Sequence, residues 1–237
     1  MTDAATLQQL KQNWECVQND VQAAARQSGR DPSSVKIIGV SKYVGSETTR
    51  ALIQAGCHDL GESRPQVLWQ KAEALSLDHD VQWHLIGHLQ RNKIRRVLRE
   101  SPIIHSVDSQ RLLAALAAES VAQNQQTSAL LEVNISGDDA KTGFAVDDMA
   151  GVIDELPSEG VRVEGLMAMA GWGTDPEDAR RQFAMLRKLR DKLVQNSELP
   201  LNELSMGMSG DFREAIAEGA TMVRIGSRLF EGVSERS

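Results

Sequence analysis

A lysine directly follows an apolar run near the start of the chain. Residues 35–40 (VKIIGV) are mostly apolar and β-branched, and Ser41 and Lys42 come next. A lysine at the carboxyl end of a buried strand is partly desolvated. This disfavours its ammonium form and supplies the neutral amine that a Schiff base requires. The same residues also fit a solvated lysine that ends a strand, so Lys42 is a candidate nucleophile that needs further support.

Two turns rich in serine and glycine lie near the other end of the chain. Segment 205–211 (SMGMSGD) places Ser209 before a predicted helix, and segment 224–228 (RIGSR) places Gly226 and Ser227 after a predicted strand. Backbone N–H groups and hydroxyls at helix N-termini bind phosphate. Ordinary strand-to-helix connections use the same residues. The two turns together nevertheless favour a phosphate site.

Arg224 lies inside an apolar segment, between Val223 and Ile225. Alternation along a strand places Met222, Arg224 and Gly226 on one side and the two aliphatic residues on the other. A buried guanidinium needs an acceptor, because an unpaired buried charge is very costly. A structural ion pair and a heteroatom of a ligand both meet that need.

Histidine and cysteine give weaker signals. His84 and His88 (HLIGH) have the four-residue spacing of metal ligands on a helix, but this segment predicts a strand followed by a glycine turn. No cysteine or acid stands at zinc-site spacing beside them, so buried or exposed histidines that bind no metal are the better interpretation. Cys57 precedes His58 and Asp59 and is interpreted as a buried thiol rather than a nucleophile.

The elements that must position these residues alternate regularly. An amphipathic helix is predicted over 4–26, and longer amphipathic segments separate eight short apolar runs. Such alternation predicts a parallel sheet, and eight units predict a (β/α)8 TIM barrel with an extra N-terminal helix; an open doubly wound sheet is the alternative. The predicted strands are 35–40, 58–61, 81–86, 103–107, 128–135, 161–169, 203–206 and 221–225.

Local signals mark where several helices begin and end. Gly56 is expected to end a helix over 47–55, and Asp108 to cap a helix over 110–124. Asp175, followed by proline, is expected to start a helix that ends near 193, and Asp211 with Glu214 has capping-box spacing. A barrel carries its site at the carboxyl ends of its strands, with phosphate bound after strands seven and eight, where the two serine-glycine turns fall.

Composition narrows the class of protein. The chain has 237 residues, with 26 Lys+Arg against 33 Asp+Glu and a net charge of −7. This length fits one barrel domain over 1–237, with 1–30 forming a helix packed on it. Two cysteines, no secretion signal and no long apolar stretch predict a cytoplasmic protein without membrane contact. The acidic balance argues against nucleic-acid binding, so an anionic ligand would need a local positive site.

Taken jointly, several segments resemble the pyridoxal phosphate homeostasis protein family, small barrel proteins related to the amino-terminal domain of alanine racemase. The resemblance spans nearly the whole chain, and seven ordered blocks are far more specific than any one of them. The blocks are 38–42 (IGVSK), 61–62 (GE), 83–87 (WHLIG) with 89–93 (LQRNK), 133–143 (VNISGDDAKTG), 165–168 (GLMA), 204–209 (LSMGMS) and 222–226 (MVRIG).

The resemblance implies a barrel that binds pyridoxal 5′-phosphate as an internal aldimine on Lys42. It implies that Ser209 and the turn at Gly226 and Ser227 hold the phosphate and that Arg224 lies near the pyridine nitrogen. His84 and Met206, which stand in two of the matching blocks, are also expected to contact the cofactor.

The chain departs from the family pattern at three positions near these blocks. Ser63 stands where the family often has asparagine, His88 where it often has proline, and Tyr43 where a smaller residue is usual. The asparagine contact is therefore in doubt, and the Tyr43 ring is expected either to cover the site or to add a hydroxyl. None of the departures changes the lysine, the phosphate turns or the arginine.

The resemblance implies a protein of intracellular vitamin B6 homeostasis that catalyses no reaction of its own. It is expected to deliver its cofactor to apo-enzymes. An amino-acid racemase of the alanine racemase type is an alternative. Its second acid/base is a tyrosine from a second domain, which this sequence lacks, and the single tyrosine here is Tyr43. A phosphate-binding barrel isomerase is a further alternative. Without the second domain that builds the racemase dimer, a monomer is expected.

Overall fold

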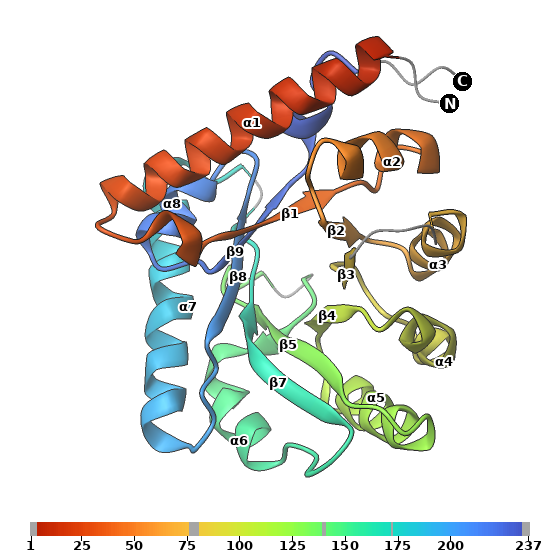
Figure 1. Cartoon of the computed structure of the whole chain (residues 1–237). Coiled ribbons are helices and arrows are strands. Elements are labelled where there is room, and N and C mark those ends of the chain that lie inside the picture. Colours follow the sequence, from red (N-terminus) through yellow and green to blue (C-terminus); the bar gives the residue numbers. More distant parts are fainter. Residues whose placement is uncertain (1–3, 76–80, 139–140, 172, 234–237) are drawn as a thin grey trace.

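The structure is a computed structural model that describes residues 4–75, 81–138, 141–171 and 173–233 (Figure 1). Its strands are β1 Lys36–Val40, β2 Asp59–Glu62, β3 Gln82–Leu85, β4 Ile103–Val107, β5 Thr127–Asn134, β6 Phe144–Ala145, β7 Val161–Met167, β8 Glu203–Met208 and β9 Met222–Ile225. Its α-helices are α1 Ala4–Gln27, α2 Ser46–Gln54, α3 Pro65–Ala74, α4 Ile94–Val97, α5 Gln110–Ala122, α6 Met149–Asp154, α7 Pro176–Asn196 and α8 Phe212–Ala217. Short 3-10 helices are η1 Pro32–Ser34, η2 Arg91–Lys93, η3 Leu98–Glu100, η4 Val146–Asp148 and η5 Ser227–Phe230.

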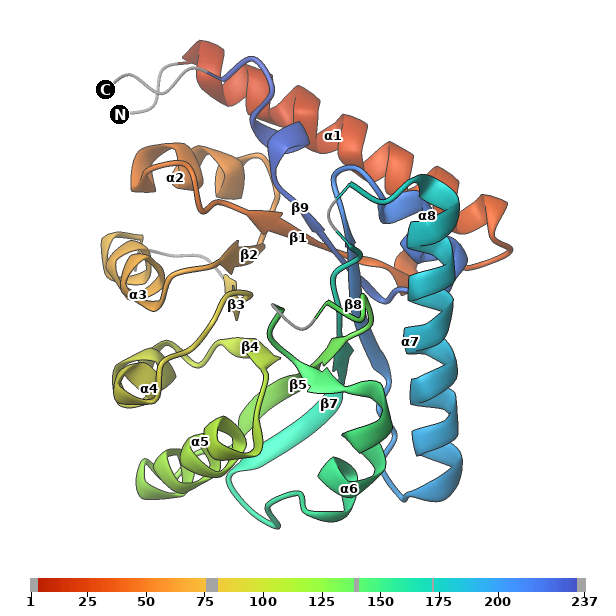
Figure 2. The same ribbon diagram turned by 180° about the vertical axis from the view of Figure 1, so that it is seen from behind.

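The described strands close into a parallel barrel. Neighbours pair in the order β4-β3-β2-β1-β9-β8-β7-β5, and a further pairing of β4 with β5 completes the ring. Helices surround the strands, and α1 lies across the outside against α2, α8 and η5 (Figures 1 and 2). The predicted (β/α)8 barrel with an extra N-terminal helix is confirmed, and the open doubly wound sheet is wrong because the edge strands pair with each other.

Alternation along the strands separates two apolar regions. Ile38, Leu130, Met167 and Met222 form a small buried cluster of their own, contributed by β1, β5, β7 and β9. Because these strands lie on several sides of the ring, this cluster fills the barrel lumen. The larger cluster, which includes Val223 and the buried faces of the helices, lies between the strands and the surrounding helices. The predicted two-sided pattern of the last strand is therefore confirmed.

Most element boundaries fall within three residues of those predicted, and the differences have local causes. Residues 92–99, between the third and fourth strands, form the short α4 flanked by η2 and η3 rather than one continuous helix. Asp108 does not cap α5; the side chain of Ser109 accepts the N–H of Leu112 instead. The capping box at Asp211 does not form, because the Asp211 carboxylate accepts the N–H of Met208 at 2.5 Å. Asp175 caps α7 as predicted.

Gly165 permits the closest approach of two barrel strands. It pairs with Glu203 across β7 and β8, and a Cβ at this position would lie 1.9 Å from the Glu203 carbonyl oxygen. Any larger residue would therefore push the backbones of β7 and β8 apart. In the described part of the chain, none of the helices combines the length and apolar character that crossing a bilayer requires.

Candidate functional site

The carboxyl ends of three neighbouring strands bring most of the predicted site residues to one end of the barrel, here called the mouth. Lys42 follows β1, Gly226 and Ser227 follow β9, and Ser209 follows β8. These three strands are consecutive in the ring, in the order β1-β9-β8. Residues far apart in sequence therefore meet on one side of the mouth, as the loops after strands one, seven and eight were predicted to do.

Lys42 is half-buried and stands beside Tyr43. Its Nζ lies 4.9 Å from the centre of the Tyr43 ring, within the range of a cation–π contact. Tyr43 is 83 % exposed, so its ring is an outer neighbour of the lysine at the mouth rather than part of the lumen. Both expectations for Tyr43, a ring that covers the site and a hydroxyl added to it, stay predictions.

A buried ion pair supports the strand end that carries Lys42. Lys71 on α3 lies 2.5 Å from the Glu62 carboxylate and donates to the Ser41 carbonyl at 2.8 Å. The Ser41 hydroxyl donates to the same Glu62 oxygen at 2.8 Å. All three side chains are almost fully buried. The peptide that joins Ser41 to Lys42 is thus tied to β2 and to α3 immediately behind the lysine.

The two predicted phosphate turns are joined to each other. The Gly226 N–H donates to Ser209 Oγ at 3.2 Å. With its oxygen accepting that bond, the Ser209 hydroxyl hydrogen is available to donate to a ligand. Ser209 is half-buried and Ser227 is exposed, so both hydroxyls are accessible from the mouth. The structure therefore brings together the donors that a phosphate would need.

Arg224 is 4 % exposed and points into the lumen. Its Nη1 donates to the Ser205 carbonyl at 2.8 Å and to Ser205 Oγ at 2.6 Å, and its Nη2 donates to the Ala168 carbonyl at 2.9 Å. Burial lowers the pKa of Arg224 to about 10, against the opposing effect of Asp211 and Glu132. The guanidinium remains charged at neutral pH. Hydrogen bonds to described residues use three of its five N–H groups.

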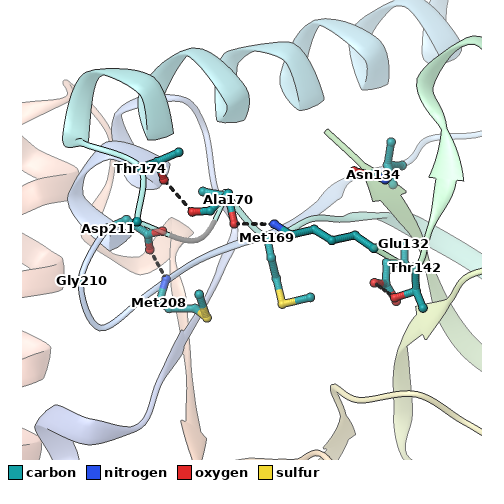
Figure 3. Close-up of a pocket in the computed structure, with 13 residues that line it drawn as sticks. Glu132, Asn134, Thr142, Met169, Ala170, Thr174, Met208, Gly210 and Asp211 are labelled. Atoms are coloured by element: carbon teal, nitrogen blue, oxygen red, sulfur yellow. Dashed lines mark hydrogen bonds between the residues drawn. The ribbon is translucent and has the colours of Figure 1, made fainter. Parts of the chain in front are cut away.

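A cavity of about 590 Å³ extends the mouth toward β5 and β7 (Figure 3). Its walls include Glu132, Asn134, Met169, Met208 and Asp211, which come from the ends of three strands. In Figure 3 the Asp211 carboxylate is bonded to the Met208 backbone on one side of the cavity, and Glu132 lies on the other. The cavity has room for a ligand of modest size.

Two carboxyl groups in this cavity have unusual protonation behaviour. Burial raises the pKa of Glu132, although a hydrogen bond from Thr142 at 2.8 Å acts against it. Burial also raises the pKa of Asp211, against the hydrogen bond from Met208. Carboxyl groups with raised pKa values in a cleft are candidates for holding or passing a proton. The positive charge of Arg224 lowers the pKa of both groups.

His84 and Met206, the other two predicted cofactor contacts, are both completely buried. His84 is completely buried, and its ring nitrogens lie 2.8 Å from His105 and 3.0 Å from Asp59. The Met206 side chain is completely buried in the cluster between strands and helices. Their contact with a cofactor stays a prediction.

His88 and Cys57, which gave weak signals in the sequence, differ in burial. His88 is exposed and bonded to Asp108, and the described residues contain no group of side chains that could hold a metal ion. Cys57 is buried, as predicted, and burial raises the pKa of its thiol to about 12. Residues 139 and 140, within the block VNISGDDAKTG, lie outside the described residues.

Sequence reasoning missed Glu132, Asp211 as a cavity residue, and the lumen partners His105 and Ser205. Glu132 is in a strand whose remaining residues are mostly apolar, and an acid at an inward position of such a strand was the available signal. Ser205 precedes a methionine and a glycine and is unremarkable in sequence, because its importance comes from Arg224 on the next strand.

Comparison with known proteins agrees with this geometry. A family model described as "Alanine racemase, N-terminal domain" matches residues 6–233. A pyridoxal phosphate homeostasis protein of Aquifex aeolicus is 39 % identical over 213 residues, which cover 89 % of this chain and 92 % of the relative. The chain belongs to the alanine racemase N-terminal domain family and, within it, to the pyridoxal phosphate homeostasis proteins.

Solved structures of similar proteins share the barrel. PipY of Synechococcus elongatus, a structure with PLP bound, has a TM-score of 0.80 and 34 % identity, covering 88 % of this chain and 98 % of PipY. A protein of unknown function from Bifidobacterium adolescentis has a TM-score of 0.91 and 34 % identity, covering 97 % of this chain and 98 % of that one. Membership of the pyridoxal phosphate homeostasis protein family therefore rests on fold and sequence together.

Proposed function

We propose that this chain binds pyridoxal 5′-phosphate at the barrel mouth and acts in cytoplasmic vitamin B6 homeostasis. In this role it holds the cofactor, limits the concentration of the free reactive aldehyde and delivers the cofactor to apo-enzymes. The observation that carries the proposal is the convergence of Lys42, the Ser209–Gly226 pair and Arg224 from three consecutive strands. The 34 % identical PipY, whose structure has PLP bound, supports it.

The residues present fit the chemical groups of this cofactor. Ser209 Oγ and the Gly226–Ser227 turn supply neutral donors for a phosphate. Lys42 supplies the amine to which the aldehyde carbon of the cofactor would bond. Arg224, almost fully buried and with two N–H groups beyond those bonded to described residues, supplies a donor for a ring nitrogen. Bound pyridoxal phosphate supplies an aldehyde and an electron-withdrawing ring.

Arg224 favours holding the cofactor over using it. A guanidinium can only donate hydrogen bonds, so it stabilises a pyridine nitrogen that carries no proton. Such a ring withdraws electrons less strongly than one whose nitrogen is protonated and donates to a neighbouring carboxylate. The residues at the mouth thus suit storage and transfer, and we propose that the protein acts as a monomer toward its apo-enzyme partners.

The first test is the absorbance spectrum of the protein after incubation with pyridoxal phosphate and removal of the excess. We expect a band above roughly 400 nm, because a cofactor ring conjugated with its C=N bond to the Lys42 amine absorbs there. Borohydride reduces this bond and should remove the band. Lys42→Ala should lack the band. Lys11→Ala, which removes an exposed lysine on α1, should keep it. A wild-type protein that stays colourless would refute the proposal.

A second assay separates storage from catalysis. The cofactor-loaded protein should not convert L-alanine to D-alanine above the rate of free pyridoxal phosphate, because racemisation needs an acid/base group on each face of the substrate. Tyr43 stands next to Lys42 and not opposite it. Clear turnover that Lys42→Ala abolishes would replace the homeostasis proposal with a racemase.

A further inference from the structure

A row of polar side chains crosses the barrel lumen and ends at Arg224. Arg224 Nη1 lies 2.6 Å from Ser205 Oγ, and Ser205 Oγ lies 2.9 Å from His105 Nδ1. His105 Nε2 lies 2.8 Å from His84 Nδ1, and His84 Nε2 lies 3.0 Å from Asp59 Oδ1. Five different strands contribute one side chain each. We refer to Asp59, His84, His105 and Ser205 as the lumen chain.

The chemistry of the two ends determines the direction of every bond between them. A guanidinium only donates and a carboxylate only accepts, whereas a neutral imidazole donates from one nitrogen and accepts at the other. Ser205 Oγ therefore accepts from Arg224 and donates to His105 Nδ1. His105 then donates from Nε2 to His84 Nδ1, and His84 donates from Nε2 to Asp59. With neutral histidines, this is the one arrangement that satisfies all four contacts.

Burial and charge favour these neutral histidines. His84 and His105 are completely buried, and burial lowers the pKa of both. The hydrogen bond and charge of Asp59 oppose this effect at His84, while Lys36 lowers the His84 pKa and Glu203 raises it. At His105, the positive charges of Arg224 and Lys36 and the neighbouring His84 ring lower the pKa further. The reversed arrangement would require a doubly protonated, buried His84.

Asp59 lies at the opposite end of the barrel from the cofactor site. It is the first residue of β2, its side chain is 27 % exposed, and it lies 3.4 Å from Lys36 Nζ, at the first residue of β1. Burial would raise the pKa of Asp59, but the His84 hydrogen bond and the charge of Lys36 hold it below its ordinary value. The lumen chain thus begins at an ionised carboxylate near solvent.

We propose that the lumen chain positions Arg224. Each donation toward Asp59 makes the next acceptor more negative, so Ser205 Oγ becomes a stronger acceptor for the guanidinium. Together with the carbonyls of Ser205 and Ala168, it holds Arg224 in one orientation and leaves two N–H groups for a ligand. The proposal rests on the proposed function, in which that ligand is the ring nitrogen of pyridoxal phosphate.

The first test needs no cofactor. In ¹⁵N-labelled wild-type protein, NMR should find both histidines with hydrogen on Nε2 and none on Nδ1. Asp59→Leu removes the terminal acceptor and should shift His105, two residues along the lumen chain, toward a mixture of tautomers. Asp59→Asn retains an acceptor oxygen and should preserve the wild-type pattern. An unchanged His105 tautomer in Asp59→Leu would overturn the lumen chain.

The second test measures pyridoxal phosphate affinity in the same variants. Asp59→Leu should bind roughly ten-fold more weakly, and Ser205→Ala should bind at least as weakly, because each frees the guanidinium. Asp59→Asn should bind like the wild type, and thermal unfolding should show that each variant is folded. Altered tautomers with unchanged affinity would refute the positioning role. A wild type that binds no pyridoxal phosphate would refute the proposed function, while the NMR result would still decide whether the lumen chain exists.

Discussion

The Ser209 hydroxyl has two roles in the proposed site, accepting from Gly226 and donating to a phosphate. Ser209→Ala removes both and leaves Lys42 intact. Loss of a hydrogen bond to a charged group costs about 1.5–3 kcal/mol, so the dissociation constant for pyridoxal phosphate should rise roughly 10- to 150-fold. Titration with pyridoxal phosphate, followed by absorbance, measures this change. The absorbance band of the cofactor bonded to Lys42 should still form at saturation.

A suitable control for this prediction is Ser158→Ala, which removes an exposed serine from the loop before β7 at the other end of the barrel. Its affinity should equal that of the wild type. Equal affinity in Ser209→Ala would show that the phosphate is held elsewhere.

The two cysteines should differ sharply in reactivity. Cys16 is exposed on α1, whereas Cys57 is buried against β1 with a pKa of about 12. Because the thiolate is the reactive form, iodoacetamide at pH 8 should modify Cys16 and leave Cys57 intact in the folded protein. Mass spectrometry of the Cys16→Ser variant should show no modification until denaturant is added. Rapid modification of that variant would contradict the buried position of Cys57.

At the scale of elements, the contact between β7 and β8 depends on Gly165. Gly165→Ala places a Cβ 1.9 Å from the Glu203 carbonyl and forces the two strands apart. Such overpacking should lower the free energy of unfolding by about 2 kcal/mol or more, as measured by urea denaturation.

Gly151→Ala is the matched control for that change. Gly151 is exposed in α6 and a Cβ there meets nothing within 4 Å, so alanine should stabilise the helix by about 0.5–1 kcal/mol. If both variants lost the same stability, the close approach of the strands would not be the cause.

The barrel elements were predictable because each carries a local signal. Strands such as β1 are short, mostly apolar runs followed by polar residues, and α7 begins with an aspartate and a proline. The broken helix around α4 and the cap at Ser109 were not predictable, because each is decided by competition between neighbouring polar residues.

The site was predictable to a similar extent. Lys42, Ser209 and Gly226 follow strand ends, and that position is visible in sequence. The lumen chain was not predictable, because its four members come from four different strands and none is distinctive alone. In the sequence, His84 was noted for its spacing to His88 and for its place in a matching block, and neither signal points to His105 or Asp59. In the structure His84 is buried and His88 is exposed.

For the whole molecule, the net charge of −7 says little about the mouth. Arg224 and Lys42 place positive charge there, while many of the acidic residues are distributed over helices at the surface. A negatively charged phosphate is therefore attracted locally by a protein that is acidic overall.

Stability should fall as the solution is acidified from pH 7.5 to 5.5. The buried histidines have pKa values below 6.5 in the folded protein, so the unfolded chain binds more protons in this range. Each histidine should contribute up to about 1.4 kcal/mol of lost stability over this interval. The raised pKa values of Glu132 and Asp211 have the opposite effect on stability, because these carboxyl groups bind protons more readily in the folded protein than in the unfolded chain. A histidine variant therefore separates the two contributions.

The variant His105→Asn should flatten this pH dependence, whatever its stability at pH 7.5, and urea denaturation at both pH values measures it. Equal dependence in His105→Asn and wild type would mean that His105 takes up protons as freely in the folded protein as in the unfolded chain.

The pairing of β1 with β9 closes the ring between segments from the two ends of the sequence. During synthesis on the ribosome, the amine of Lys42 emerges long before its phosphate donors on the loops after β8 and β9. A partly made chain therefore has the reactive group without the means to retain the cofactor. Tight capture should begin only after β9 and the loop that follows it have been made, and the ligand would then stabilise the completed ring against reopening.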